Sequence, residues 1–200
     1  MSLAETLREA LELGHRRAPE LIEGDPLDPH LSDFEAITPA AVLVAVVDRP
    51  EPTVILTVRP ETMRRHAGQI AFPGGRIDPG DDGPVAAALR EAEEEIGLPP
   101  DAVEVIGLAD CYRTVTGFEV TPVVGVVPPG LSLTPHPGEV ADVFEAPLHY
   151  LLQPRHQVVR MAMWRGRERS YYEIDYEGRR IWGATAAMIV NLSRRLVLVS

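Results

Sequence analysis

The sequence has little cysteine and no long apolar run, and each absence excludes a class of protein. Cys111 is the only cysteine among 200 residues, so neither an internal disulfide nor a cysteine-rich zinc site can form. We expect this lone thiol to fill space in the core. The longest apolar run, residues 39–47, is too short to cross a bilayer, and no membrane helix is expected.

An excess of positive charge is also missing. The formal net charge is −11, which opposes binding to a nucleic acid polymer, because such binding normally depends on a basic surface that neutralises phosphates. A small phosphorylated substrate remains compatible with this charge, since a local cation cluster and a metal ion can hold it. The first residues lack the basic and apolar stretches of a secretory signal, so we expect a cytoplasmic location.

The chain reads as one domain at residues 40–200, preceded by an appendage at residues 1–39 that holds a short helix and a proline-containing loop. The order of elements is strands, helix, strands, helix, which favours an α+β fold with a mixed sheet between helices. The predicted strands, rich in β-branched residues or bounded by turn residues, are 41–47, 53–58, 102–108, 119–127, 157–164 and 170–176. The predicted helices, from apolar residues at helical spacing, are 3–13, 85–96 and 184–197.

The helix at 85–96 carries the most informative pattern. Glu91, Glu94 and Glu95 fall within an arc of roughly 100°, beside the apolar face of the helix. Like charges at this spacing destabilise a helix by ~0.2–0.5 kcal/mol, so local stability does not explain them. Carboxylate oxygens suit magnesium or manganese, which would remove the repulsion. The alternative is a solvated acidic face on which Arg90 pairs with Glu94.

A glycine pair, Gly74 and Gly75, precedes this helix. Paired glycines let the backbone approach a ligand closely, and a loop that enters a helix offers free N–H groups to phosphate oxygens. Such a pair alone is more often a simple turn. Combined with the three glutamates, it predicts a loop and helix that hold a metal pyrophosphate.

This loop and helix resemble the Nudix box, G-x5-E-x7-R-E-U-x-E-E-x-G-U, where U is aliphatic. Every specified position fits from Arg90 to Leu98. The front half departs from the pattern, because the stretch from Gly75 to Arg90 is one residue longer and its first glutamate is replaced by Asp81 or Asp82. One inserted residue in the loop explains both departures.

A second resemblance narrows the subfamily. Residues 55–59, Ile-Leu-Thr-Val-Arg, and the glycine-rich segment that follows them are similar to the segment ahead of the box in Nudix coenzyme A pyrophosphatases. Residues 116–125 and 181–185 are also similar to that subfamily. Together the resemblance covers residues 40–198.

The resemblance implies a Nudix-type α/β/α sandwich with a mixed β-sheet and a loop–helix–loop catalytic motif. It also implies that Glu91 and Glu95 hold a metal, with Glu94 supporting it or a second ion. We therefore expect Mg²⁺, with Mn²⁺ as the alternative. Arg90 matches a position that usually orients the carboxylates.

The implied reaction is attack of water on the pyrophosphate of coenzyme A or its derivatives, giving 4′-phosphopantetheine and adenosine 3′,5′-bisphosphate. Glu94 and Glu139 are the candidates for the general base, and an ordinary loop role is the alternative for Glu139. The aromatic candidates for stacking on adenine, each also suited to the core, are Tyr112, Phe118 and Trp182. The candidate substrate-binding residues are Arg59, Arg64, Arg65, His66, Gly74 and Gly75.

Two other functions fit the sequence. The first is a Nudix hydrolase for ADP-ribose or another nucleoside diphosphate derivative, because the box reads only the pyrophosphate and the metal. The second is a non-catalytic Nudix-like module that binds a nucleotide, which the intact glutamate set argues against. The expected partner is a small-molecule pyrophosphate. The sequence leaves the oligomeric state open, a homodimer included.

Overall fold

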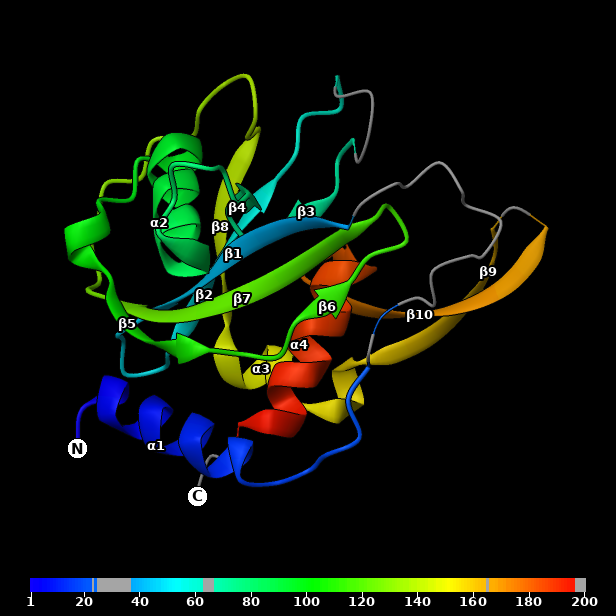
Figure 1. Cartoon of the computed structure of the whole chain (residues 1–200), viewed down its shortest axis with the longest axis horizontal. Coiled ribbons are helices and arrows are strands. Elements are labelled where there is room, and N and C mark those ends of the chain that lie inside the picture. The colour runs from blue at the N-terminus through cyan, green and yellow to red at the C-terminus, as the bar shows by residue number, and fades with distance from the viewer. Residues whose placement is uncertain (23, 25–36, 63–66, 165, 197–200) are drawn as a thin grey trace.

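The structure, a computed structural model, describes residues 1–22, 24, 37–62, 67–164 and 166–196. A mixed eight-stranded sheet forms its centre (Figure 1). Along it the order is β3-β2-β1-β7-β5, with β4 beside β1, β6 beside β7 and β8 beside β2. The strands are β1 (Thr38–Val47), β2 (Thr53–Val58), β3 (Ile70–Ala71), β4 (Gly74–Arg76), β5 (Glu104–Leu108), β6 (Tyr112–Arg113), β7 (Phe118–Val127) and β8 (Asp142–Pro147).

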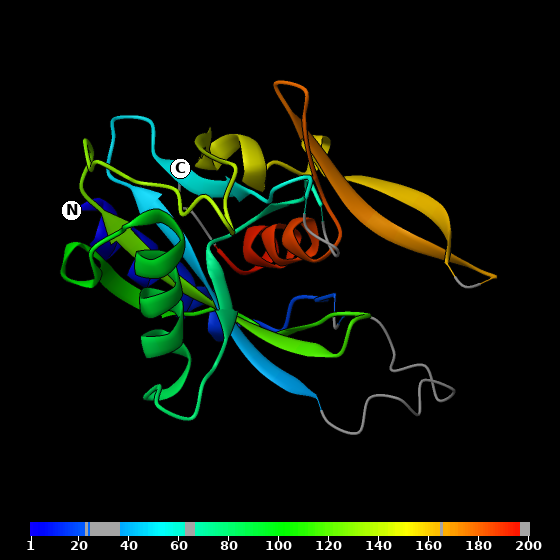
Figure 2. The ribbon, with the colours of Figure 1, turned by 90° about the horizontal axis from the view of Figure 1, so that it is seen from above.

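A second, three-stranded antiparallel sheet has the order β11-β10-β9. Its strands are β9 (Val158–Trp164), β10 (Arg167–Tyr176) and β11 (Arg179–Trp182). The hairpin of β9 and β10 projects away from the main body (Figures 1 and 2). The helices are α1 (Leu3–His15), α2 (Gly83–Ile96), α3 (Leu148–Leu152) and α4 (Ala184–Arg195), with short 3₁₀ turns at Pro100–Ala102 and Pro154–His156.

Strand β1 organises the main sheet. It pairs in parallel with β7 along its whole length, and on its other edge it pairs with β4 at residues 40–42 and with β2 at residues 46 and 47. Alternate side chains point to opposite faces of a strand, so β1 contributes to two cores. Leu43 lies in the core under α2, and Val44 and Val46 lie in the core under α4.

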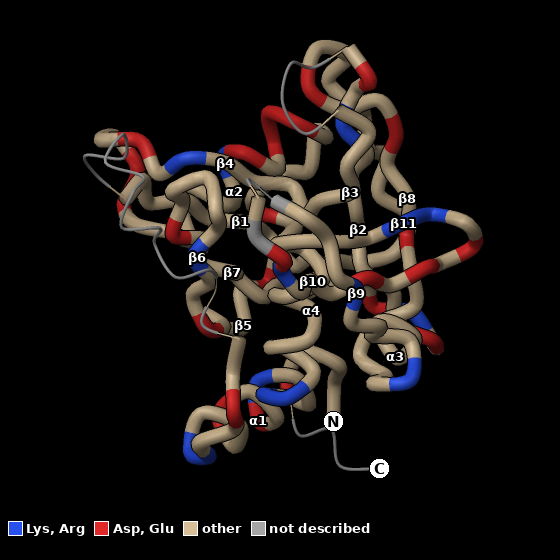
Figure 3. The backbone as a smooth tube through the Cα atoms, turned by 90° about the vertical axis from the view of Figure 1, so that its right-hand side faces the viewer, with Lys and Arg blue, Asp and Glu red and all other residues tan. Residues whose placement is uncertain are grey.

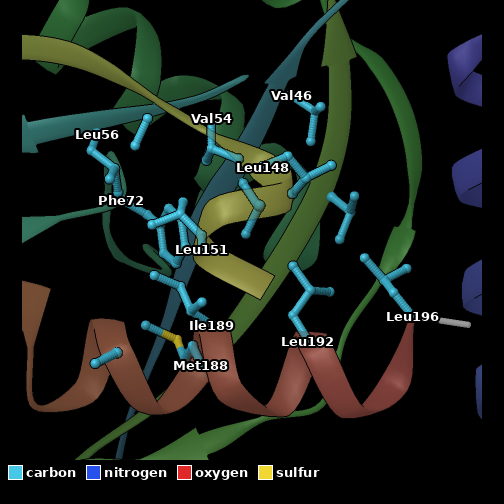
Figure 4. Close-up of a cluster of buried hydrophobic side chains, with 14 of the residues drawn as sticks. Val46, Val54, Leu56, Phe72, Leu148, Leu151, Met188, Ile189, Leu192 and Leu196 are labelled. Carbon is cyan, nitrogen blue, oxygen red and sulfur yellow. The ribbon is translucent and has the colours of Figure 1, made fainter. Parts of the chain in front are cut away.

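The larger core lies between the main sheet and helices α3 and α4. Figure 4 shows Leu56 and Phe72 from the sheet side facing Leu151, Ile189 and neighbouring residues of the two helices. The smaller core lies under α2, whose face there is built mainly from alanines. Small side chains let this helix approach the sheet closely, which brings its acidic edge to the glycines of β4.

A proline and a glycine determine where α2 begins and ends. Pro84 is in the first turn, where its missing N–H costs nothing, and Gly97 ends the helix in the left-handed conformation at φ 66°. The predicted helix 85–96 is confirmed, with two more residues at the start. Asp82 occupies the N-cap position without a side-chain hydrogen bond.

Helix α1 packs onto the domain. Leu7 and Leu11 are buried in the same core as α4. The C-terminal end of α1 is bound by Arg195 of α4, which donates to the carbonyl of Gly14 at 2.7 Å. Arg195 also binds Asp110 through two hydrogen bonds of 2.8 and 2.6 Å. The predicted division at residue 40 stays a prediction, because α1 shares a core with the residues that follow it.

The remaining strand and helix predictions are confirmed with shifted ends, and strand 53–58 matches β2 fully. The sequence missed the short elements β3, β4, β6, α3 and β11, and also β8. The expectation for Cys111 was wrong: the residue is exposed, and its Sγ lies 3.4 Å from Thr121 Oγ1. In the view of Figure 3, basic positions are scattered among acidic ones. None of the helices in the described part of the chain is long and apolar enough to cross a membrane.

Candidate active site

Glu95 is the most deeply placed acid of the site. Its side chain projects from the last turn of α2, the residue is only 5% exposed, and Oε2 accepts a hydrogen bond of 3.1 Å from the Gly74 amide. The pKa of Glu95 is raised to about 7, chiefly by burial and to a smaller extent by the charges of Glu91 and Glu139. The Gly74 amide and the charge of Arg59 act against this rise in pKa.

Glu91 lies one turn earlier on the same helix, against Gly75. A Cβ atom added to Gly75 would lie 2.5 Å from the carboxyl carbon of Glu91, so a side chain here would displace this carboxylate from its position. Burial raises the pKa of Glu91, with further contributions from Glu94 and Glu139, while Arg90 opposes the rise. The glycine pair therefore admits acidic side chains beside the strand, in addition to the phosphate role predicted from the sequence.

Gly74 itself is fixed by the sheet. It has a φ of 154°, and a Cβ there would lie 2.4 Å from the carbonyl oxygen of Ala41 in β1. The same residue pairs with Val42 across β4 and β1. Its amide is consequently held in place for Glu95 by the register of the sheet.

Arg90 connects the acids on the outer side of the helix. It binds Asp81 through two hydrogen bonds of 2.9 Å each, and its Nη1 donates to Glu91 at 3.0 Å and to Glu94 at 3.1 Å. The paired guanidinium, with the Asp78 amide, lowers the pKa of Asp81 to about 2. Asp81, rather than Asp82, thus faces Arg90 at the position where the box pattern has its first glutamate.

Glu94 lies apart from the buried pair. Its side chain is 57% exposed and pairs with Arg90, four residues earlier on the helix. This is the arrangement that the solvated-face alternative predicts for Glu94. Glu91 and Glu95 do not follow that alternative, because both carboxylates turn towards the glycines of β4.

Glu139 reaches the site from the loop between β7 and β8. The loop is tied to the end of α2, because the His136 amide donates to the carbonyl of Glu95 at 2.8 Å and the Thr134 amide to that of Ile96 at 2.8 Å. The Glu139 amide then closes a turn on the His136 carbonyl at 3.0 Å. The charge of Glu139 acts on both Glu91 and Glu95, so the fold brings this predicted residue to the same site.

The predicted basic cluster is described only in part. Arg59, at the end of β2, is half-buried, and its charge lowers the pKa of Glu95. Arg64, Arg65 and His66 lie outside the described residues. Sequence reasoning missed a second cation, Arg76, which ends β4 directly after the glycine pair.

The acids fit a divalent cation by their chemistry. The negative charges of Glu91, Glu95 and Glu139 raise one another's energy, with Glu91 and Glu95 beside Gly75 and Gly74, and a hard cation would offset this repulsion. Within the described ranges, no three His, Cys, Asp or Glu side chains are close enough together to form a ready metal cage. Binding would therefore draw the carboxylates closer together.

The raised pKa of Glu95 predicts a pH-dependent difference in stability. A carboxyl whose folded pKa lies above its unfolded value stabilises the fold most at low pH, and that contribution is lost as pH rises from about 4.5 to about 7. In metal-free buffer, Glu95→Gln should therefore gain about 1–2 kcal/mol relative to the parent protein between pH 5 and pH 8. Urea unfolding at both pH values measures this gain. An equal difference at both pH values would contradict it.

Comparisons with known proteins identify related chains. The model of the NUDIX domain matches residues 37–165. An uncharacterized Nudix hydrolase, NudL, of Cronobacter sakazakii is 44% identical over 188 residues, covering 88% of this chain and 98% of the relative. NudL of Salmonella paratyphi B is 44% identical over 183 residues, covering 86% and 93%. A Nudix hydrolase of M. smegmatis, RenU, is structurally similar, with a TM-score of 0.49, 24% identity and coverage of 58% of this chain and 74% of that one. The chain therefore belongs to the Nudix family of hydrolases, which act on pyrophosphate bonds.

Proposed function

We propose that this protein hydrolyses the pyrophosphate bond of coenzyme A or its derivatives, giving 4′-phosphopantetheine and adenosine 3′,5′-bisphosphate. The observation that carries the chemistry is that Glu95 accepts a hydrogen bond from the Gly74 amide and Glu91 lies against Gly75, with the charge of Glu139 acting on both acids. The substrate assignment rests on residues 55–75, which resemble the segment ahead of the box in coenzyme A pyrophosphatases.

Nudix hydrolases generally use divalent metal ions, and we propose Mg²⁺, with Mn²⁺ as the alternative. Glu91 and Glu95 would hold the ion. When bound, the ion neutralises phosphate oxygens and lowers the pKa of the attacking water. Arg90 then has the role of a positioning residue, because it binds Glu91 on one side and Asp81 on the other.

For the general base, the geometry favours Glu139 over Glu94. The base takes a proton from the water whose oxygen attacks phosphorus, while the bond from that phosphorus to the bridging oxygen breaks. Glu94 is engaged by Arg90 on the exposed side of α2, whereas the charge of Glu139 acts on both Glu91 and Glu95 from the loop between β7 and β8. A base has to reach the water beside those acids, and we assign this role to Glu139 because it is exposed on a loop that is tied to the end of α2 at Glu95.

The 3′-phosphate of coenzyme A tests the substrate assignment. We assign this phosphate to the basic segment that includes Arg64 and Arg65, which lie outside the described residues. A charge-assisted hydrogen bond contributes roughly 1.5–3 kcal/mol, so coenzyme A should be preferred over 3′-dephospho-coenzyme A by about tenfold to a hundredfold in kcat/KM. Steady-state kinetics on the two substrates with Mg²⁺ measures this preference.

The double variant with Arg64→Ala and Arg65→Ala tests whether these two residues cause the preference. It should lose most of the preference and raise KM for coenzyme A, while hydrolysis of the dephospho substrate changes little. A substrate panel with product identification, run with and without Mg²⁺, completes the test. Faster hydrolysis of ADP-ribose than of coenzyme A, or no preference for the 3′-phosphate, would contradict the coenzyme A assignment. The general assignment as a Nudix pyrophosphate hydrolase would remain.

A further inference from the structure

Arg76 is a cation beside the site that the proposed chemistry does not use. The residue is exposed at the end of β4, and its guanidinium pairs with no carboxylate among the residues that the structure describes. Its carbonyl accepts a hydrogen bond of 3.1 Å from Arg90, which fixes the backbone at this point. The guanidinium carbon lies over the ring of Phe118, 5.6 Å from its centroid.

The register of the sheet creates this contact. Arg76 lies opposite Ala40 of β1, and Ala40 lies beside Val120 of β7, two residues after Phe118. Side chains two residues apart share a face of a strand, so Arg76 and Phe118 both point to the α4 side of the sheet. Because Ala40 has only a methyl group, the long arginine side chain can cross β1 to reach the ring.

The position of Phe118 is fixed by core packing and by a hydrogen-bonded turn. The ring is half-buried and packs against the larger core. The backbone on either side closes a turn, since the Phe118 amide donates to Thr114 Oγ1 at 3.0 Å and the Thr114 amide donates to the Phe118 carbonyl at 2.9 Å. The ring thus supports the guanidinium from a fixed position.

A second pair of the same kind has a different environment. Arg179 lies over the ring of Phe144 at 4.2 Å, but Arg179 also binds Asp142 at 2.9 Å. The N–H groups at the edge of the Arg179 guanidinium are therefore already engaged by a carboxylate. For Arg76, the ring occupies one face, and in the described part of the chain no carboxylate bonds to the edge.

A guanidinium stacks through its faces and donates hydrogen bonds through its edge. We propose that Arg76 and Phe118 form a subsite for the nucleoside half of the substrate, in which a purine base stacks on the outer face of Arg76 and the edge donates to an adjoining phosphate oxygen. Arg76 follows Gly75 in the chain, and consecutive Cα atoms are about 3.8 Å apart. Gly75 faces Glu91 on the α2 side of the sheet and Arg76 points to the α4 side, so the substrate would pass over the end of β4, with its pyrophosphate beside Glu91 and its base on the α4 side.

This inference rests on the proposed function only in requiring a purine nucleoside diphosphate derivative, so it does not depend on coenzyme A itself. The experiment uses the two halves of the proposed substrate as separate ligands. Adenosine 3′,5′-bisphosphate and 4′-phosphopantetheine are titrated by calorimetry, with Mg²⁺ present, into the full-length protein and its variants. AMP serves as a third ligand that has no 3′-phosphate.

Base stacking predicts a graded result. Arg76→Ala should weaken binding of adenosine 3′,5′-bisphosphate and of AMP by about tenfold or more, and Phe118→Leu by a smaller factor. Arg76→Lys keeps the charge without the planar face, so it should recover only part of the loss. Binding of 4′-phosphopantetheine should stay within about twofold in all three variants. Phe144→Leu, which disrupts the other pair, should bind all three ligands as the parent does.

Several outcomes would overturn the subsite. These are unchanged nucleotide binding in Arg76→Ala, full recovery in Arg76→Lys, an equal loss for both halves of the substrate, or no measurable nucleotide binding by the parent. Arg76 is exposed, so its variants test the idea even where Phe118→Leu loses stability. If the parent fails to hydrolyse coenzyme A but the AMP result holds, the substrate proposal falls and the subsite remains.

Discussion

Replacing Glu91 or Glu95 with glutamine is expected to lower turnover by at least ~100-fold. Each change removes one metal-binding negative charge with little change in volume. Both carboxylates are partly or largely buried beside the glycine pair. Water molecules therefore cannot fully take over their role as ligands of the metal ion. Initial rates with coenzyme A at saturating Mg²⁺ measure the effect.

Glu93→Gln is the matched control for this prediction. Glu93 is exposed on the same helix, between the acids of the site, so the same chemical change there should leave turnover within about twofold. Thermal unfolding of all three variants separates a loss of chemistry from a loss of fold. Activity retained by Glu91→Gln and Glu95→Gln at saturating Mg²⁺ would refute their assigned roles.

Arg195→Ala is expected to cost about 3–5 kcal/mol of stability, because it breaks a largely buried ion pair from one side. The Arg195 side chain is 8% exposed and that of Asp110 is 21% exposed. The change leaves the Asp110 carboxylate without its two hydrogen bonds and removes the donor to the carbonyls of Gly14 and Arg17. Equilibrium unfolding in urea at pH 7 gives the free energy of unfolding.

The control is Arg8→Ala on the outer side of α1. Arg8 bonds to Glu104 at 2.9 Å, but the two side chains are 38% and 58% exposed, so its loss should cost less than about 1 kcal/mol. A loss at Arg195 no larger than the loss at Arg8 would show that the junction of α1 with α4 contributes little.

Local patterns made much of this architecture predictable. The ends of α2 follow from Pro84 and Gly97, and strand β2 follows from a run of β-branched residues between turns. Strands β3 and β6 have two residues each and β4 has three, so no alternation can mark them in a sequence. They form because longer neighbouring strands offer free edges.

The site was predictable to the extent that it lies on one helix and the loop before it. Spacing placed the three glutamates on one arc, but it did not separate the exposed Glu94 from the buried Glu95, since that difference depends on what packs above the helix. Choosing Asp81 over Asp82 required the position of Arg90. The partnership of Arg195 with Asp110 joins residues 85 positions apart and leaves no local signal.

The pairing of β4 along β1 also determines how the site would come apart. Proteins open in cooperative units, and strands at the centre of a sheet exchange their amide hydrogens last. Strand β1 lies at such a centre, because it is bonded to β7 on one edge and to β4 and β2 on the other, whereas Gly74 and Gly75 lie in β4, which among the described strands is bonded to β1 alone. The backbone that receives Glu91 and Glu95 should therefore exchange its amide hydrogens earlier than β1 and β7, and the site can open while the centre of the sheet stays folded.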